Sequence, residues 1–198
     1  MRSKQESREQ LLQVAVAEFA KNGFEKTSVR SIAKAAGASP ALLIHYFHSK
    51  DELVREAIIT TLGQWVEKEK TALLADEETR LGDWIKLVKE NQTKLQFLRQ
   101  VLLAKNEYSS SLFEYSLLET QAMMKTATDM GMMEEPEDAE ALAALLTTQA
   151  LASLIFLPEL ERSLGGKVTD DAVAARLQKA QSQFLPLKIT QNKKKARS

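Results

Sequence analysis

Residues 27–50, TSVRSIAKAAGASPALLIHYFHSK, carry the most specific structural signals in this chain. Val29 and Ile32 have the spacing of one helical face. Gly37 follows, a residue able to take positive φ in a tight turn. Ser39 and Pro40 then form a helix start, with serine as the cap and proline in the first turn. The stretch predicts two short helices, at about 28–35 and 39–47, joined by a tight turn.

The residues on either side predict two longer helices. Before the stretch, a helix at about 5–21 carries an apolar stripe and ends at Asn22-Gly23. Thr27 is the expected N-cap of the next helix. After the stretch, Ser49 and Glu52 have the spacing of a capping box, which predicts a new helix running past Leu62.

The rest of the chain is also predicted to be helical. With four prolines and seven glycines in 198 residues, it has few helix breakers. Helices are expected at about 79–104 (with a break near Gln92), 109–131, 136–163 and 169–186. The longest uncharged stretch, Ala141–Pro158, is shorter than the roughly 20 apolar residues that a membrane span needs, so a buried helix and no membrane contact are expected.

The charged residues are unevenly distributed, although the net charge is zero. Residues 1–50 have a net charge of +4, whereas residues 51–187 have a net charge of −9. A basic N-terminal segment followed by an acidic remainder is typical of a phosphate-binding module joined to a separate domain. The chain has no cysteine and opens with a polar segment, which favours a cytoplasmic protein without disulfides.

Two short helices joined by a glycine-containing turn form a helix-turn-helix, whose second helix fits the DNA major groove. Leu43 and Phe47 are predicted to be core, which leaves the opposite face of the second helix for bases. Hydroxyl, amide and basic groups near helix starts suit phosphates. For Tyr46 we expect a phosphate contact, with packing of its ring as the alternative. The candidate DNA contacts are Thr27, Ser28, Arg30, Ser39, Pro40, Ala41, Ile44, His45, Tyr46, His48 and Lys50.

Residues 5–55 resemble the N-terminal domain of the tetracycline-repressor (TetR) family. The resemblance rests on Phe19-Ala20-x-x-Gly23-Phe24-x-x-Thr27-Ser28-Val29-x-x-Ile32-Ala33-x-x-Ala36-Gly37-x-Ser39 and on Leu43-x-His45-Tyr46-Phe47-x-Ser49-Lys50. It implies a homodimer that grips a palindromic operator in double-stranded DNA. It also implies a second domain that dimerises through its last two long helices and binds a small-molecule inducer, which releases the DNA.

The chain departs from that pattern at two positions of the second short helix. Ala41 stands where the family usually has glycine, and Ile44 stands where it usually has tyrosine. Ile44 cannot donate the hydrogen bond of a tyrosine hydroxyl, so we expect it to make an apolar contact, such as one with a thymine methyl group.

Large or polar side chains of the second domain are the candidates for a ligand pocket, with ordinary core packing as the alternative for each. They are Trp65, Trp84, Phe97, Tyr108, Phe113, Tyr115, Met123, Met124 and Gln149. The uncharged helix and the helix at 169–186 are the dimer candidates, where Ala143, Ala144, Ala150 and Ala152 would allow close helix packing.

The sequence therefore predicts an all-α protein with an N-terminal three-helix helix-turn-helix domain at 1–48. A C-terminal helical bundle for ligand binding and dimerisation follows at 49–190, and then a disordered basic tail at 191–198. The predicted function is that of a repressor released by an inducer; the alternative is a DNA-binding regulator controlled by a protein partner. An enzyme is not expected, because no nucleophile–base set or phosphate loop is present. Neither a cofactor nor a metal is expected, since His45 and His48 alone are too few for a zinc site.

Overall fold

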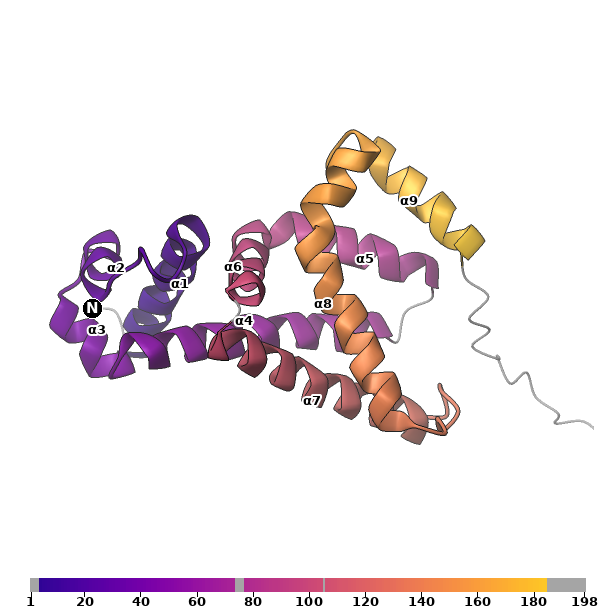
Figure 1. The fold of residues 1–198 in the computed structure, drawn as a ribbon, viewed down its shortest axis with the longest axis horizontal. Helices are drawn as coiled ribbons and strands as arrows, with labels where there is room; N and C mark the ends of the chain where they lie inside the picture. Colours follow the sequence, from indigo (N-terminus) through magenta and orange to yellow (C-terminus); the bar gives the residue numbers. More distant parts are fainter. Residues whose placement is uncertain (1–3, 74–76, 105, 185–198) are drawn as a thin grey trace, which may run out of the picture.

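The regular structure is entirely α-helical in the computed structural model, which describes residues 4–73, 77–104 and 106–184. This confirms the predicted fold class. In chain order the helices are α1 (Lys4–Asn22), α2 (Val29–Ala35), α3 (Pro40–Phe47), α4 (Lys50–Leu73), α5 (Glu77–Glu90), α6 (Gln92–Leu103), α7 (Glu107–Asp129), α8 (Ala139–Leu164) and α9 (Asp171–Phe184) (Figure 1).

The helix ends follow the local signals of the sequence. α1 ends where Gly23 takes a φ of 75° and donates its amide to the Phe19 carbonyl at 2.9 Å. The predicted break near Gln92 separates α5 from α6. α8 begins behind Asp138, whose carboxylate accepts from the Ala141 amide at 2.9 Å.

The long helix α4 joins two groups of helices. It packs against α1 and α3 of the N-terminal group and against α5 and α7 of the second group (Figure 1). α6 packs against α1, so the N-terminal group also contacts the second group directly. α7 in turn packs against α8.

A single hydrophobic core runs through both groups of helices. It includes Phe19 of α1, Leu43 of α3, Phe97 of α6 and Leu154 of α8. The head formed by α1–α3 is therefore packed against the second group of helices. The domain boundaries given above stay a prediction.

α8 differs from the buried helix that the sequence predicted. Its inner face is Ala143, Thr147, Leu151 and Leu154, a helical spacing directed at α6 and α7. Among the described residues it is the helix long and apolar enough to span a membrane, but only 22% of its most apolar window is buried within the chain. The prediction of a buried helix is wrong for the single chain, because only one face has a partner there.

Candidate DNA-binding site

The α2–turn–α3 unit is defined by two serine caps. At the start of α2, the Ser28 hydroxyl accepts from the Ser31 amide at 3.0 Å, and the Ser31 hydroxyl accepts from the Ser28 amide at 2.9 Å. Gly37, with a φ of 64°, makes the turn. Ser39 then caps α3 by accepting from the Leu42 amide at 3.1 Å, with Pro40 in the first turn, as predicted.

Thr27 is part of the scaffold and not the cap of α2. Its side chain is buried, and its hydroxyl donates to the Gly23 carbonyl at 2.7 Å and to the Glu18 carbonyl at 3.3 Å. The predicted N-cap is therefore wrong by one residue. The hydroxyl of Thr27 does not reach the surface, so we remove it from the candidate phosphate contacts.

α3 has one buried and one exposed face. Leu43 and Phe47 are 1% and 2% exposed, which anchors the helix on the core as predicted. The opposite face is open to solvent, and at its middle the Ile44 side chain is 42% exposed. The predicted base-reading residues that lie on the surface are Pro40, Ala41, Ile44 and His45. Leu42, which the sequence analysis did not single out, is exposed beside them.

The predicted phosphate contacts surround this exposed face. Ser28, Arg30, Ser39 and His48 are exposed, whereas Tyr46 is half-buried with its ring 5.5 Å from that of His45. Tyr46 also packs against the core, which is the alternative given for its ring in the sequence analysis.

Lys50 has a structural partner that the sequence did not reveal. Its ammonium donates to the Phe24 carbonyl, which ties the first turn of α4 to the loop after α1. This bond uses one of the three donors of the ammonium. Replacement of Lys50 would thus disturb the head as well as any phosphate contact.

Arg8 of α1 is a further residue that positions α3, and sequence reasoning missed it. Its guanidinium forms an ion pair with Glu56 of α4 at 2.6 Å and lies 5.0 Å from the ring centre of Phe47. One side chain therefore holds the end of α3 against α1 and α4. Nothing in the local sequence marks Arg8, because its partners lie about 40 and 50 residues away.

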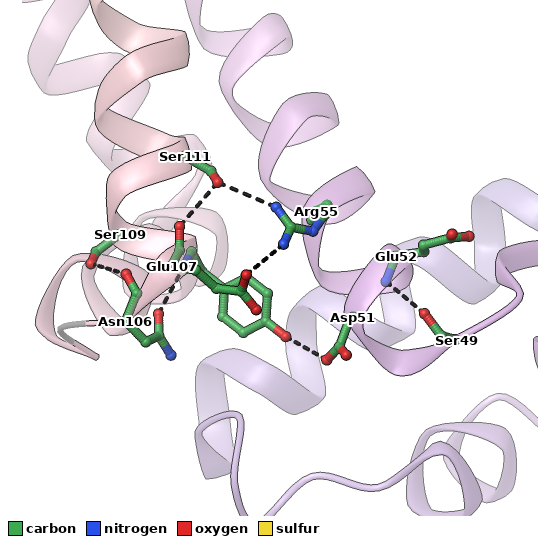
Figure 2. A network of polar contacts seen from close by, with 9 residues as sticks. Ser49, Asp51, Glu52, Arg55, Asn106, Glu107, Ser109 and Ser111 are labelled. Carbon is green, nitrogen blue, oxygen red and sulfur yellow. Dashed lines mark hydrogen bonds and ion pairs between the residues drawn. The ribbon is translucent and has the colours of Figure 1, made fainter.

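A network of polar contacts joins the start of α4 to the start of α7 (Figure 2). The Tyr108 hydroxyl donates to Asp51 at 2.5 Å, and Arg55 pairs with Glu107 at 2.8 Å. The Arg55–Glu107 pair is solvent-exposed, so it adds little stability by itself. The Tyr108–Asp51 bond is better shielded, because Tyr108 is buried.

Tyr108 keeps its proton throughout the physiological range. Burial, the hydrogen bond to Asp51 and the charges of Asp51 and Glu107 raise the pKa of its phenol from 10 to about 12, against a smaller opposing effect of Arg55. The phenol is therefore a permanent donor to Asp51 near neutral pH.

Two of the predicted pocket residues have another role in the structure. Phe97 and Tyr108 join Phe19 and Phe24 in an aromatic cluster, with ring centres 5.2–6.2 Å apart. This cluster lies between the N-terminal head and α6–α7. Phe97 and Tyr108 thus belong to the contact between the two groups of helices.

The other predicted pocket residues occupy different environments. Gln149 is exposed on α8 and does not face the interior, which corrects its assignment. Trp84, Phe113 and Tyr115 are half-buried and pack against the core. Met124 is buried and Met123 is half-buried. The side chain of Trp65 lies outside the described residues. Among the described residues no group of three or more metal-ligating side chains occurs.

Comparison with known proteins finds a family match for the N-terminal part of the chain. Residues 11–57 match the model for bacterial regulatory proteins of the tetR family. An uncharacterised HTH-type transcriptional regulator of Mycobacterium tuberculosis is 26% identical over 181 residues, which cover 79% of this chain and 89% of that protein. The HTH-type transcriptional repressor KstR2 of Mycolicibacterium smegmatis is 43% identical over 51 residues, 26% of this chain and 25% of the repressor.

Solved structures with the same fold extend the likeness to most of the chain. The fatty acid degradation regulator FadR from Bacillus halodurans is 14% identical with a TM-score of 0.67, covering 89% of this chain and 98% of that one. A tetR family transcription regulator from Shewanella has a TM-score of 0.64 and 19% identity, with coverages of 92% and 95%.

Proposed function

We propose that the chain is a DNA-binding transcriptional regulator of the tetR family, a homodimeric repressor that leaves a palindromic operator when a small molecule binds. The geometry of α3 is the main support for this proposal. A short helix anchored by Leu43 and Phe47 presents its other face, with Ile44 at the centre, to solvent. The head that carries it has a net charge of +4 over residues 1–50.

We assign the contacts with DNA bases to the exposed face of α3, and the contacts with phosphates to the residues around that face. Ala41, Ile44 and His45 lie on a helix of the size that enters the major groove. Ser28, Arg30 and Lys50 supply hydroxyl and cationic groups near the starts of α2 and α4. The phosphate contacts set the affinity and its salt dependence, and the base contacts of α3 set the preferred sequence.

A second copy of this chain is the partner proposed for α8. Leu145, Leu146, Phe156 and Leu160 are exposed large apolar residues on this helix. No charged residue occurs between Ala141 and Pro158, so the part of the face that holds Leu145, Leu146 and Phe156 fits a like surface without charge repulsion. Exposed apolar patches of this kind are costly in a monomer. Ala143 faces the interior, so among the four predicted small residues it does not serve this contact.

The inducer is proposed to bind among the helices that follow the head, and the protein to act in the cytoplasm. Trp84, Phe113, Tyr115, Met123 and Met124 stay candidates for the ligand contacts, because aromatic and methionine side chains adapt to apolar ligands.

A gel-shift titration tests the proposed function. Purified protein is added to the DNA upstream of its own gene at low and at physiological salt, with an unrelated duplex as competitor. We expect a shift that survives the competitor and weakens steeply with salt. Gln13→Ala, on the exposed side of α1, is the control variant and should bind as the wild type does. The absence of any shift at low salt would overturn the proposal.

The same titration, repeated with a panel of hydrophobic and cationic compounds, tests the inducer. Release of the DNA by one compound supports a small-molecule inducer. Retention of the DNA with every compound, together with release by a protein from the same cells, would favour control by a protein partner instead.

A further inference from the structure

The junction between α3 and α4 has an uncommon backbone conformation. His48 has φ 59° and ψ −45°, and among the described residues it is the one non-glycine residue with positive φ. The Ser49 amide donates to the Phe47 carbonyl at 2.6 Å across it. These values describe a γ-turn of the rare, strained kind, centred on His48.

A side chain at this φ costs free energy, because Cβ crowds the backbone, and such a conformation persists only where the surroundings impose it. Both sides of His48 are held. Before it, Phe47 is 2% exposed and lies under the guanidinium of Arg8. After it, Lys50 donates to the Phe24 carbonyl, and the Ser49 hydroxyl accepts from the Glu52 amide at 3.0 Å.

The γ-turn also explains a difference from the predicted capping box of α4. The serine half of the box is present, since Ser49 accepts from the Glu52 amide. The Ser49 amide is donated to Phe47 and not to the Glu52 side chain, as a full box would require. The first turn of α4 is thus bound to the last residue of α3.

We propose that His48 is a positioning residue, whose strained backbone fixes the angle between α3 and α4 in the orientation that fits the major groove. This inference rests on the proposed function and concerns the same site. Since α4 is the helix that joins the head to the rest of the chain, the angle at His48 sets how α3 is presented to DNA. The head is therefore pre-organised for binding, because the free energy needed to hold this conformation is supplied during folding and not when DNA binds.

The backbone role of His48 is separable from any contact of its imidazole with DNA. His48→Ala removes the imidazole and keeps a Cβ at positive φ. His48→Gly also removes the imidazole, but relieves the strain and permits other angles at the junction. The comparison between these two variants isolates the backbone.

The two variants are expected to differ in opposite directions in two measurements. His48→Gly should melt a few degrees higher than His48→Ala, because glycine has no Cβ to crowd the backbone at this φ. It should bind the operator about three- to tenfold more weakly than His48→Ala, because the binding-competent angle is then only one of several populated angles. A His48→Gly variant that is both less stable and weaker in binding than His48→Ala would have an ordinary folding defect, which would overturn the positioning role.

The experiment is thermal unfolding and fluorescence anisotropy on the full chain, with the upstream DNA fragment as probe. Ala35→Gly, at the exposed end of α2, is the control for added flexibility in the head, and it should lower the melting temperature. If His48→Ala does not fold, His48→Asn takes its place, since asparagine tolerates positive φ better.

Equal melting temperatures or equal affinities of the glycine and alanine variants would overturn the role of His48 while the proposed function stands. A wild-type protein that binds no DNA would instead overturn the proposed function, and the positioning role with it.

Discussion

Individual residues decide what the reading head contacts, and Ile44 is the clearest example. The sequence identified it as a departure from the usual tyrosine, and the structure places it, 42% exposed, on the free face of α3. Its neighbours Leu43 and Phe47 are buried, so the orientation of Ile44 is imposed by the core and not by its own preference for burial.

Truncation of Ile44 tests its contact with DNA. Ile44→Ala removes the apolar surface offered to a base, and we expect about three- to tenfold weaker binding to the preferred site with altered preference at one position of each half-site. Selection of binding sites from a random pool measures both the strength of binding and the preferred sequence. Ile59→Ala, a similarly exposed isoleucine on α4, is the matched control. Unchanged affinity and preference for Ile44→Ala would show that Ile44 makes no contact.

Tyr108 gives a prediction about pH. Its pKa is raised from 10 to about 12 in the folded state, so its protonated form stabilises the fold. This contribution is complete below pH 10 and is lost as the pH rises from 10 towards 12. The free energy of unfolding of the wild type minus that of Tyr108→Phe should therefore be constant below pH 9 and fall above pH 10.

Urea unfolding of both proteins from pH 7 to 11 measures this difference. The other titrating groups are common to both proteins and cancel. A difference that does not change with pH would mean that the Tyr108 hydroxyl contributes nothing through Asp51.

The residues that could not be predicted have partners distant in sequence. Arg8 and Lys50 each contact groups at least 26 positions away, and the hydroxyl of Thr27 is committed to the end of α1. Local patterns showed that Thr27, Ser39 and Ser49 could cap a helix, but not whether tertiary packing would use each hydroxyl elsewhere.

At the scale of the elements, the local signals were sufficient for most helix ends. Ser39-Pro40 and Asn22-Gly23 mark their boundaries correctly, because capping and positive φ depend on residues a few positions apart. The start of α2 was ambiguous, since Thr27 and Ser28 are both good caps. The burial of α8 was predicted wrongly, because an uncharged stretch does not tell how much of the helix surface the rest of the chain covers, and here only the face of Ala143, Thr147, Leu151 and Leu154 is buried.

The capping box of α2 can be tested directly. Ser28→Ala removes the acceptor for the Ser31 amide, and we expect the protein to lose about 1 kcal/mol of stability. The melting temperature should fall by roughly 2–4 °C. Lys26→Ala, an exposed change before the cap, is the control and should alter stability by less than about 0.5 kcal/mol. An equal effect of both variants would contradict the assigned cap.

At the scale of the whole molecule, one core connects the reading head with the helices that follow it. The aromatic cluster of Phe19, Phe24, Phe97 and Tyr108 and the network at the start of α7 lie at this contact. A ligand that displaced α6 or α7 would therefore act on α4 and on the head without a flexible linker between them.

The proposed dimer gives a prediction at this scale. Leu145→Glu with Phe156→Glu places two charges on the exposed face of α8, and we expect a monomer at micromolar concentration with operator binding weakened at least about tenfold. Sedimentation velocity measures the mass. Leu118→Glu, an equally exposed leucine on α7, is the control. A double variant that still sediments as a dimer would show that the second copy binds elsewhere.

Footprinting of the protein on the DNA upstream of its own gene tests whether two copies of α3 read the two halves of an inverted sequence. We expect two protected half-sites of inverted sequence, with centres about one helical turn or a multiple apart, and a changed footprint for Ile44→Ala. Protection of no site at low salt, or uniform protection of every sequence alike, would contradict this expectation.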